Sequence, residues 1–182
     1  MTMNRNSQKK IIIFSGKQLS GKDCVAKMLL EKLTNFRRIG LGDAIKLEYS
    51  EQTGLSLDEI ESNKVIYRAD LIALGNKRRS EDIDYWIKKV ISLPDNIVVP
   101  DVRMMRELEI FKSAKAFTIR VNAPLEQRLL RGALANIDDE TETQLDNIND
   151  WDYVIENDGS LDELIKKVNK LYEFISKNYL IY

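Results

Sequence analysis

The sequence has 182 residues, of which 43% are hydrophobic, and its 28 lysine and arginine residues nearly balance its 29 aspartate and glutamate residues. A chain of this length buries one substantial core but is short for two, so we predict a single domain over residues 1–182. The near-neutral charge gives no global field that would draw the protein to nucleic acid or to a membrane surface, so we expect neither as a partner.

The sequence also lacks the marks of export and of membrane insertion. Cys24 is its single cysteine, which excludes an internal disulfide, and the first residues, MTMNRNSQKK, contain no apolar stretch of the kind found in secretory signals. The longest apolar runs fall far short of the roughly 20 residues that a membrane-spanning helix needs. We therefore expect a cytoplasmic protein, and the sequence leaves its oligomeric state open.

Short β-rich runs alternate with longer stretches of helical period, which is typical of a parallel sheet covered by helices. Strands are predicted at 10–15, 37–41, 96–100, 116–121 and 153–156. Helices are predicted at 22–33, 44–53, 63–77, 83–91, 104–112, 125–132 and 161–177. We expect an α/β fold of three layers, with a five-stranded parallel sheet flanked by helices. Residues 135–150, ANIDDETETQLDNIND, are acidic and weakly patterned, which favours a mobile loop.

The segment FSGKQLSGKDCV, residues 14–25, nearly matches the phosphate-binding pattern G-x-x-x-x-G-K-[ST]. A β-branched strand leads into it and an amphipathic helix follows, which is the context that the pattern requires. Gly16 and Gly21 allow the backbone to fold around phosphate oxygens. The amides of residues 20–22 and the helix N-terminus supply partial positive charge, and Lys22 adds a full one. We predict an anion cradle; the alternative is a glycine turn with a surface lysine.

Two residues after the loop lysine need their own interpretation. Asp23 stands where the pattern has a hydroxyl group for Mg²⁺. Its carboxylate can bind the metal through water, or it can be a plain aspartate that the dipole of the helix favours. The thiol of Cys24 would ionise more readily near a helix N-terminus, but we favour a buried packing role for it.

At these residues the chain resembles the animal-type phosphomevalonate kinases, a P-loop family of the nucleoside monophosphate kinase fold that also carries GKD in place of GK[ST]. The resemblance continues in the same order through IKLEYSEQTGL, YRADLIALGNKRRS, VVPDVR, TIRV, LEQRLLRG and LDNINDWDYVIENDG, and it covers most of the chain. The segments YWIKKV, VVPDVR and ENDGSLDELIKKV are also similar to the phage deoxynucleoside monophosphate kinases. The resemblance implies a kinase that uses ATP and Mg²⁺ to phosphorylate a small, already phosphorylated acceptor. Phosphomevalonate is the first candidate and a nucleoside or deoxynucleoside monophosphate the second.

The resemblance implies roles for individual residues. The nucleotide would be bound by Gly16, Lys17, Gln18, Ser20, Gly21, Lys22, Asp23 and Cys24. The acceptor would be bound by Arg103 and by basic residues of the helices in 43–80, namely Lys46, Lys64, Arg68 and Arg79. Mg²⁺ would be approached by Asp101, in the Walker B position, and by Asp23. The catalytic residues would be Lys22, Asp23, Arg103, Arg128 and Arg131, with the last two on a lid at 128–150.

The residues themselves leave simpler alternatives open. Residues 76–80, NKRRS, can be a solvated helix end where cations favour the dipole. Arg128 and Arg131 can form surface ion pairs with Glu126 or with the acidic loop. For Asp101 we favour function, because carboxylates at strand ends of α/β sheets lie where ligands bind.

The chemistry expected from composition agrees with phosphoryl transfer. The sequence contains no histidine, so no side chain has an unperturbed pKa suited to proton shuttling near neutrality. A phosphate acceptor is ionised at pH 7 and needs no strong base, which reduces catalysis to alignment and charge neutralisation. The animal enzymes, however, have basic residues where this loop has Gln18 and Leu19, and a second arginine where Met104 follows Arg103. A nucleotide-binding regulatory protein without transfer activity is therefore a further alternative.

Overall fold

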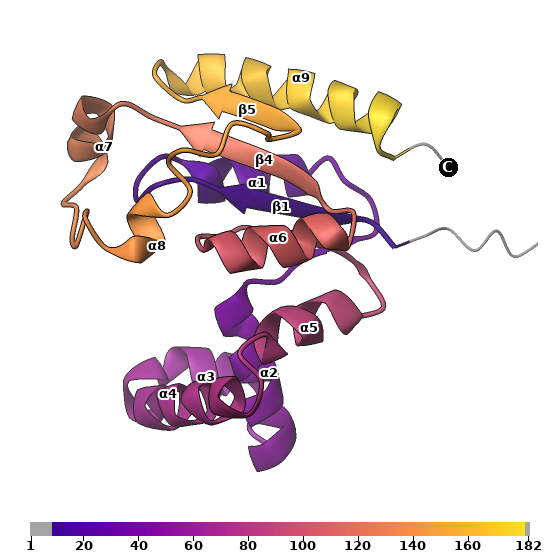
Figure 1. The fold of residues 1–182 in the computed structure, drawn as a ribbon, viewed down its shortest axis with the longest axis vertical. Helices are drawn as coiled ribbons and strands as arrows, with labels where there is room; N and C mark the ends of the chain where they lie inside the picture. Colours follow the sequence, from indigo (N-terminus) through magenta and orange to yellow (C-terminus); the bar gives the residue numbers. More distant parts are fainter. Residues whose placement is uncertain (1–8, 181–182) are drawn as a thin grey trace, which may run out of the picture. The chain divides into compact units, whose positions relative to one another are not determined.

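A computed structural model describes residues 9–180, and these form two compact units (Figure 1). What we call the sheet unit contains the described residues up to Arg38 and from Pro94 onward, and the helical unit is Ile39–Leu93. The helical unit is thus an insertion in the sequence of the sheet unit. That the whole chain acts as one domain stays a prediction.

The sheet unit is built on five parallel strands in the order β2-β3-β1-β4-β5. Their bounds are β1 Ile11–Ser15, β2 Phe36–Arg38, β3 Asn96–Val99, β4 Phe117–Asn122 and β5 Tyr153–Glu156. β1 lies at the centre, with Ile12 opposite Val98 of β3 and Phe117 of β4, and every residue of β1 is buried. A strand covered on both faces has no polar side, which explains the unbroken apolar run IIIF. The predicted five-stranded parallel sheet is confirmed.

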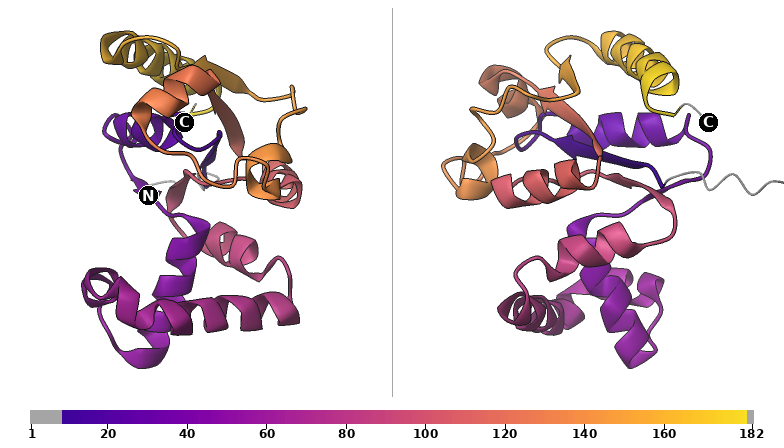
Figure 2. Two further views of the ribbon diagram at one scale, coloured as in Figure 1. Left: turned by 90° about the vertical axis from the view of Figure 1, so that its left-hand side faces the viewer. Right: turned by 45° about the vertical axis from the view of Figure 1, so that its right-hand side comes forward.

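Helices cover both faces of this sheet, which confirms the predicted three layers (Figure 2). Helices α1 (Lys22–Leu30) and α9 (Leu161–Asn178) pack on one face, and α6 (Met105–Ser113) lies on the other. A capping box of Ser160 and Glu163 begins α9. The apolar stripe of α9 then enters the core through Leu164, Val168, Leu171 and Ile175.

Two shorter helices follow β4 and lie at the carboxyl ends of the strands (Figure 1). They are α7 (Leu125–Arg131) and α8 (Glu140–Thr143). Parallel strands carry their ligand sites at this edge, because the loops after the strands gather there.

The helical unit consists of α2 (Leu41–Thr53), α3 (Leu57–Ser62), α4 (Lys64–Glu81) and α5 (Tyr85–Ser92). Glu48 of α2 is only 3% exposed and joins three elements of this unit. It accepts hydrogen bonds from Arg78 Nε at 2.7 Å, Tyr85 Oη at 2.7 Å and Lys89 Nζ at 2.8 Å. Burial alone would raise the pKa of Glu48, but the hydrogen bonds from Lys89, Tyr85 and Arg78 outweigh it and hold that pKa at about 2.

The predicted strand 37–41 is wrong at its end, because β2 stops at Arg38 and α2 begins at Leu41. The cause is a cap that the sequence contains: the Asp43 carboxylate accepts the Gly40 N–H at 2.9 Å, which ends the extended run.

Two short helices were not predicted. Ser56 begins α3 by accepting the Glu59 N–H, and Asp139 begins α8 by accepting the Thr141 N–H. The acidic stretch 135–150 therefore contains a helix. Cys24 is exposed, so the buried role predicted for it is also wrong. It is not among the residues with which α1 packs into the core, such as Val25 and Leu29.

Within residues 9–180, no helix combines the length and the apolar character that crossing a membrane requires.

Glu48→Gln should destabilise the protein. At pH 7 we expect the free energy of unfolding in urea to fall by about 2 kcal/mol, because an amide cannot accept from three donors and leaves cations unpaired. The folded-state pKa of Glu48 is depressed from 4.5 to about 2, so this difference is full above pH 4.5 and disappears as the pH falls through about 2.

Glu51→Gln is the matched control, since Glu51 also pairs with Lys89, at 3.3 Å, but is exposed. For Glu51→Gln, the decrease in the free energy of unfolding should stay below about 0.5 kcal/mol. Equal effects of the two substitutions, or an effect of Glu48→Gln that does not change between pH 7 and pH 3, would contradict this account of the network.

Candidate functional site

The candidate site begins at the loop between β1 and α1, where the backbone leaves almost no space for side chains. A Cβ on Gly16 would lie 2.5 Å from Val121 O and 2.6 Å from Ser20 Oγ. Gly21 has a φ of 93°, which glycine adopts readily, and a Cβ there would collide with the side-chain amide of Asn157. Leu19 is also held at a positive φ, 58°. A tight turn of this kind presents backbone amides at close range to an anion.

Lys22 places a full positive charge at the start of α1. Although it is a lysine, it is only 5% exposed, and its Nζ lies 3.4 Å from Asp23 Oδ2. Asp23 is exposed and lies 3.8 Å from Arg38 Nη2 as well. The first amides of α1 have no partner within the helix. The Ser20 N–H, predicted to face the anion, instead closes the turn on Lys17 O at 3.1 Å.

The two arginines of α7 bind the carbonyl oxygens of this loop. Arg128 Nη1 donates to Gln18 O at 3.4 Å, and Arg131 Nη1 donates to Leu19 O at 3.0 Å and to Ser20 O at 3.2 Å. Arg131 Nη2 also donates to the backbone oxygen of Asn157 at 2.9 Å, and the Asn157 amide donates to Ser20 O at 2.8 Å. Both arginines therefore serve the loop rather than Glu126 or an exposed ion pair.

Glu142 of α8 reaches the same loop with its carboxylate. It is 5% exposed, and its two oxygens have different partners. Oε2 accepts the backbone N–H of Gln18 at 2.7 Å, and Oε1 accepts from Arg103 Nη1 at 2.5 Å. Arg103 follows β3, so one carboxylate joins the loop after β1 to the end of the neighbouring strand.

Asp146 makes a second connection of this kind. Its Oδ2 lies 2.6 Å from Lys17 Nζ, and its Oδ1 accepts from Arg120 Nη2 at 3.4 Å. Arg120 lies within β4 and also donates to Ser15 Oγ at 3.0 Å. Burial lowers the pKa of Arg120 and outweighs the opposite effect of Asp146 and Glu142, so desolvation dominates around this guanidinium.

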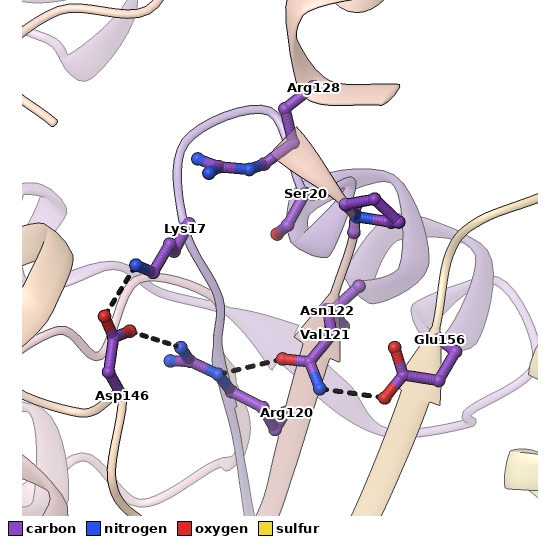
Figure 3. Close-up of a pocket in the computed structure, with 10 residues that line it drawn as sticks. Lys17, Ser20, Arg120, Val121, Asn122, Arg128, Asp146 and Glu156 are labelled. Atoms are coloured by element: carbon purple, nitrogen blue, oxygen red, sulfur yellow. Dashed lines mark hydrogen bonds and ion pairs between the residues drawn. The ribbon is translucent and has the colours of Figure 1, made fainter. Parts of the chain in front are cut away.

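A cavity of about 420 Å³ opens beside the loop, over the ends of β4 and β5 (Figure 3). Figure 3 shows Lys17, Ser20, Arg120 and Arg128 around it, with Asp146 and Glu156 on the opposite sides. Ser20 Oγ and Arg128 Nε are buried and have no hydrogen-bond partner. Buried polar atoms normally have partners, so these two lining residues are suited to a polar ligand.

The described residues contain no group of three or more histidine, cysteine, aspartate or glutamate side chains that could hold a metal ion. The predicted candidates are Asp23, exposed at the start of α1, and Asp101, half-buried two residues after the end of β3. Single carboxylates of this kind suit Mg²⁺, which retains water and is shared with substrate phosphates.

The predicted acceptor residues lie in two places. Arg103 belongs to the sheet unit, whereas Lys46, Lys64, Arg68 and Arg79 lie on α2 and α4 of the helical unit. Lys46 is paired with Glu61 at 2.5 Å and with Asp43 at 3.3 Å. These two carboxylates raise the pKa of Lys46 even though its burial acts to lower it.

The other three predicted acceptor residues, Lys64, Arg68 and Arg79, are exposed. Lys64 pairs with Glu61 at 3.3 Å, Arg68 is exposed on α4, and Arg79 donates to Asn76 Oδ1 at 2.9 Å. In the NKRRS segment it is Arg78, not Arg79, that the buried Glu48 holds. The acceptor role of these residues stays a prediction.

The sequence reasoning missed four residues that the structure brings to the loop or to the strand that leads into it: Arg120, Glu142, Asp146 and Asn157. The arginine had a signal, because a charged residue within the buried strand TIRV needs a polar partner. The two carboxylates had none, since they are two among many in an acidic stretch.

The chain is similar to known kinases over most of its length. A sequence model of the phosphomevalonate kinase family matches residues 14–117, and one of the deoxynucleotide monophosphate kinase family matches residues 79–168. The phosphomevalonate kinase of Drosophila melanogaster is 30% identical over 172 residues, covering 85% of this chain and 91% of the fly protein. The guanylate kinase of Rickettsia conorii is 26% identical over 188 residues, covering 93% of this chain and 80% of that protein.

Solved structures of shikimate kinases have the same fold. The Acinetobacter baumannii enzyme, solved in complex with shikimate, gives a TM-score of 0.54 at 16% identity, covering 95% of this chain and 96% of that chain. The Aquifex aeolicus enzyme gives 0.50 at 18% identity, covering 92% and 99%. At these identities the likeness concerns the fold alone, and it confirms the predicted P-loop kinase fold.

Gly21→Ala should disable the loop. The substitution forces an L-residue into a φ of 93° and pushes its methyl group against Asn157, so the turn must open. We expect the affinity for MgADP, measured by calorimetry, to fall by at least about 10-fold, since the loop amides lose their geometry. Gly42→Ala in α2 is the control, because a Cβ there meets nothing within 4 Å. Unchanged affinity of Gly21→Ala would contradict the role of the loop.

Proposed function

The chain belongs to the phosphomevalonate kinase family and is an ATP-dependent kinase, and on that premise we propose that its acceptor is phosphomevalonate. The γ-phosphoryl group of ATP would pass to a phosphate oxygen of the acceptor. The bond between the γ-phosphorus and the bridging oxygen breaks, the bond to the acceptor oxygen forms, and ADP and diphosphomevalonate leave.

The observation that carries this proposal is the set of cations around one loop of the sheet unit. Lys22 begins α1, Arg103 lies in the segment that follows β3, and Arg120 comes from β4. Transfer between two phosphates places several negative charges in a small space, so fixed positive groups stabilise both the bound substrates and the transition state. Because the acceptor phosphate is already ionised, the lack of histidine in the sequence is no obstacle.

We assign different roles to these groups. Lys22 and the amides at the start of α1 bind the phosphates of ATP, and Arg103 contacts the transferred phosphoryl group. Arg128 faces the cavity, where its unpartnered Nε suits a polar group of the nucleotide. Arg131 holds the loop through its carbonyl oxygens and acts as a positioning residue.

Mg²⁺ would arrive with ATP, and Asp23 and Asp101 are the side chains that would hold it. When bound, it neutralises charge on the phosphates. Asp23 fits this role because it is exposed next to Lys22.

The neutral residue Gln18 helps to fix the loop in place through its side-chain amide. The side chain of Gln18 donates to Ala135 O at 2.7 Å and accepts the Ala135 N–H at 3.2 Å. A lysine or arginine cannot form this reciprocal pair, because neither has an acceptor. The amide thus ties the loop to the segment after α7, which supports a working loop over the alternative of a regulatory protein without transfer activity.

A nucleoside or deoxynucleoside monophosphate is the second candidate acceptor. The match to the deoxynucleotide monophosphate kinase family over residues 79–168 favours it, as does the similarity to a guanylate kinase. The match includes Arg103, Arg120 and both carboxylates that bind the loop. The two candidates share this phosphate chemistry and differ in the rest of the acceptor.

Release of ADP from MgATP should occur with phosphomevalonate, and much less with mevalonate or with the common ribo- and deoxyribonucleoside monophosphates. Lys22→Ala should lower kcat by about 100-fold or more, because it removes a charge that stabilises the transferred phosphoryl group. Lys27→Ala, on the exposed face of the same helix, is the control and should keep wild-type turnover.

The panel separates the alternatives. Turnover with a nucleotide and none with phosphomevalonate would reject the proposed acceptor in favour of the second candidate. Binding of ATP without turnover on any acceptor of the panel would reject both.

A further inference from the structure

The segment 139–146 carries two carboxylates that bind the phosphate loop in the same way. Glu142 and Asp146 are four residues apart, and each has one partner in the loop and one arginine partner, which follows β3 or lies in β4, the two strands that border β1. The loop partners, Lys17 and Gln18, are neighbours in sequence. From this repeated pattern we infer that Glu142 and Asp146 are positioning residues that fix the site's arginines against the phosphate loop. We call them the carboxylate clamp.

The clamp joins the strands on both sides of the loop. Glu142 holds Arg103 after β3, and Asp146 holds Arg120 in β4. Long guanidinium side chains lose much rotamer freedom when they are fixed, so an unheld arginine would have to be ordered at each catalytic cycle. A bound carboxylate does this before the substrate arrives, which is the preorganisation that electrostatic catalysis requires.

The same contacts argue against a blocking role. A carboxylate that mimicked phosphate would occupy the turn of the loop, at residues 19–22. Glu142 and Asp146 bind only at Gln18 and Lys17, on the limb that leads into the turn, and Lys22 pairs with Asp23 instead. Arg103 keeps 31% of its side chain exposed while Glu142 holds it, so it is fixed but not covered.

Packing around the clamp also favours positioning. The crevice that Ser15, Arg103, Arg120 and Glu142 border leaves no volume that a water molecule can occupy. Hydrogen bonds between charged groups are strong and directional, and both Glu142 and Arg120 are buried. The clamp can therefore set where the guanidinium groups lie, to within the precision that phosphoryl transfer needs.

The test is a double-substitution cycle between Glu142 and Arg103, and it rests on the proposed function only through the role of Arg103 at the transferred phosphoryl group. Affinities for a non-hydrolysable ATP analogue and for ADP, both with Mg²⁺, are measured by calorimetry in the full chain. Glu142→Gln should lower the affinity for the analogue by about 10-fold and the affinity for ADP by less than about 2-fold. The reason is that only the analogue has the γ-phosphate that Arg103 contacts in the proposed function.

Coupling distinguishes positioning from general damage. In the Arg103→Ala background, Glu142→Gln should have no further effect on analogue affinity, since it acts through the missing arginine. The effect of Asp146→Asn on analogue affinity should add to that of Arg103→Ala, because the arginine partner of Asp146 is Arg120. Glu140→Gln, an exposed carboxylate of the same helix, is the matched control and should leave both affinities unchanged.

Three results would overturn the inference: additive effects of Glu142→Gln and Arg103→Ala, tighter binding of nucleotide by Glu142→Gln, or an Arg103→Ala protein with wild-type analogue affinity. The second would mean that the carboxylate competes with phosphate. Because the cycle is read by binding, it decides the inference even if no acceptor of the panel is phosphorylated, a result that would reject the proposed function alone. If Glu142→Gln does not fold, Glu142→Asp, which keeps the charge but shortens its reach, takes its place in the cycle.

Discussion

The close packing of the phosphate loop against the neighbouring strand sets the conditions for the whole site. At Gly16 the loop lies so near Val121 O and Ser20 Oγ that a single added carbon would clash, and at Gly21 the same holds for Asn157. The loop cannot hold itself in this shape with its own side chains, since the residues that form the tightest contacts have none. Its geometry must be supplied by groups that reach it from β4, α7, α8 and the residues after β5. The buried central strand fixes the position at which the loop begins, and these groups determine the path of its backbone.

Donors and acceptors reach the loop in a complementary arrangement. Arg128, Arg131 and Asn157 donate to its carbonyl oxygens, whereas Glu142 accepts its Gln18 amide and Asp146 binds its Lys17 ammonium. Each of these contacts satisfies a polar group of the loop that would otherwise lack a hydrogen-bond partner or compete with the ligand for one. The amides at the start of α1 and the buried Lys22 are thereby left for an anion. In the proposed function, the hydrogen bonds that shape the loop are also the ones that leave these groups for phosphate.

How much of the fold and of the site can be predicted from the sequence depends on how far apart the interacting residues lie along the chain. The sheet, the loop and Lys22 were predictable because a strand, a glycine turn and a helix are encoded within about 25 consecutive residues. The ends of β2 and the short helices α3 and α8 depend on single caps at Gly40, Ser56 and Asp139, which periodicity does not detect. Glu142 and Arg120 could not be assigned, because their partners lie more than 100 residues away in sequence at Gln18 and Ser15. The register of β4 against β1 places Arg120 opposite Ser15, and the fold of the segment after α7 brings Glu142 to Gln18.

The charge balance of the chain takes on a physical meaning at this site. Cations collected to bind phosphates would repel one another in the empty protein, and a net excess of lysine and arginine would attract other polyanions. Pairing Lys17, Arg103 and Arg120 with buried or half-buried carboxylates removes that repulsion without removing the cations. The cost is that an incoming phosphate meets negative charge as well as positive charge. This repulsion between carboxylate and phosphate is limited by their positions. The carboxylates bind the limb of the loop and the phosphates are expected at its turn, so the two kinds of anion need not share a hydrogen-bond donor. A kinase loop with a neutral Gln18 and Leu19 is consistent with the proposed function, which assigns the phosphate contacts to Lys22 and to arginines that neighbouring elements hold in place.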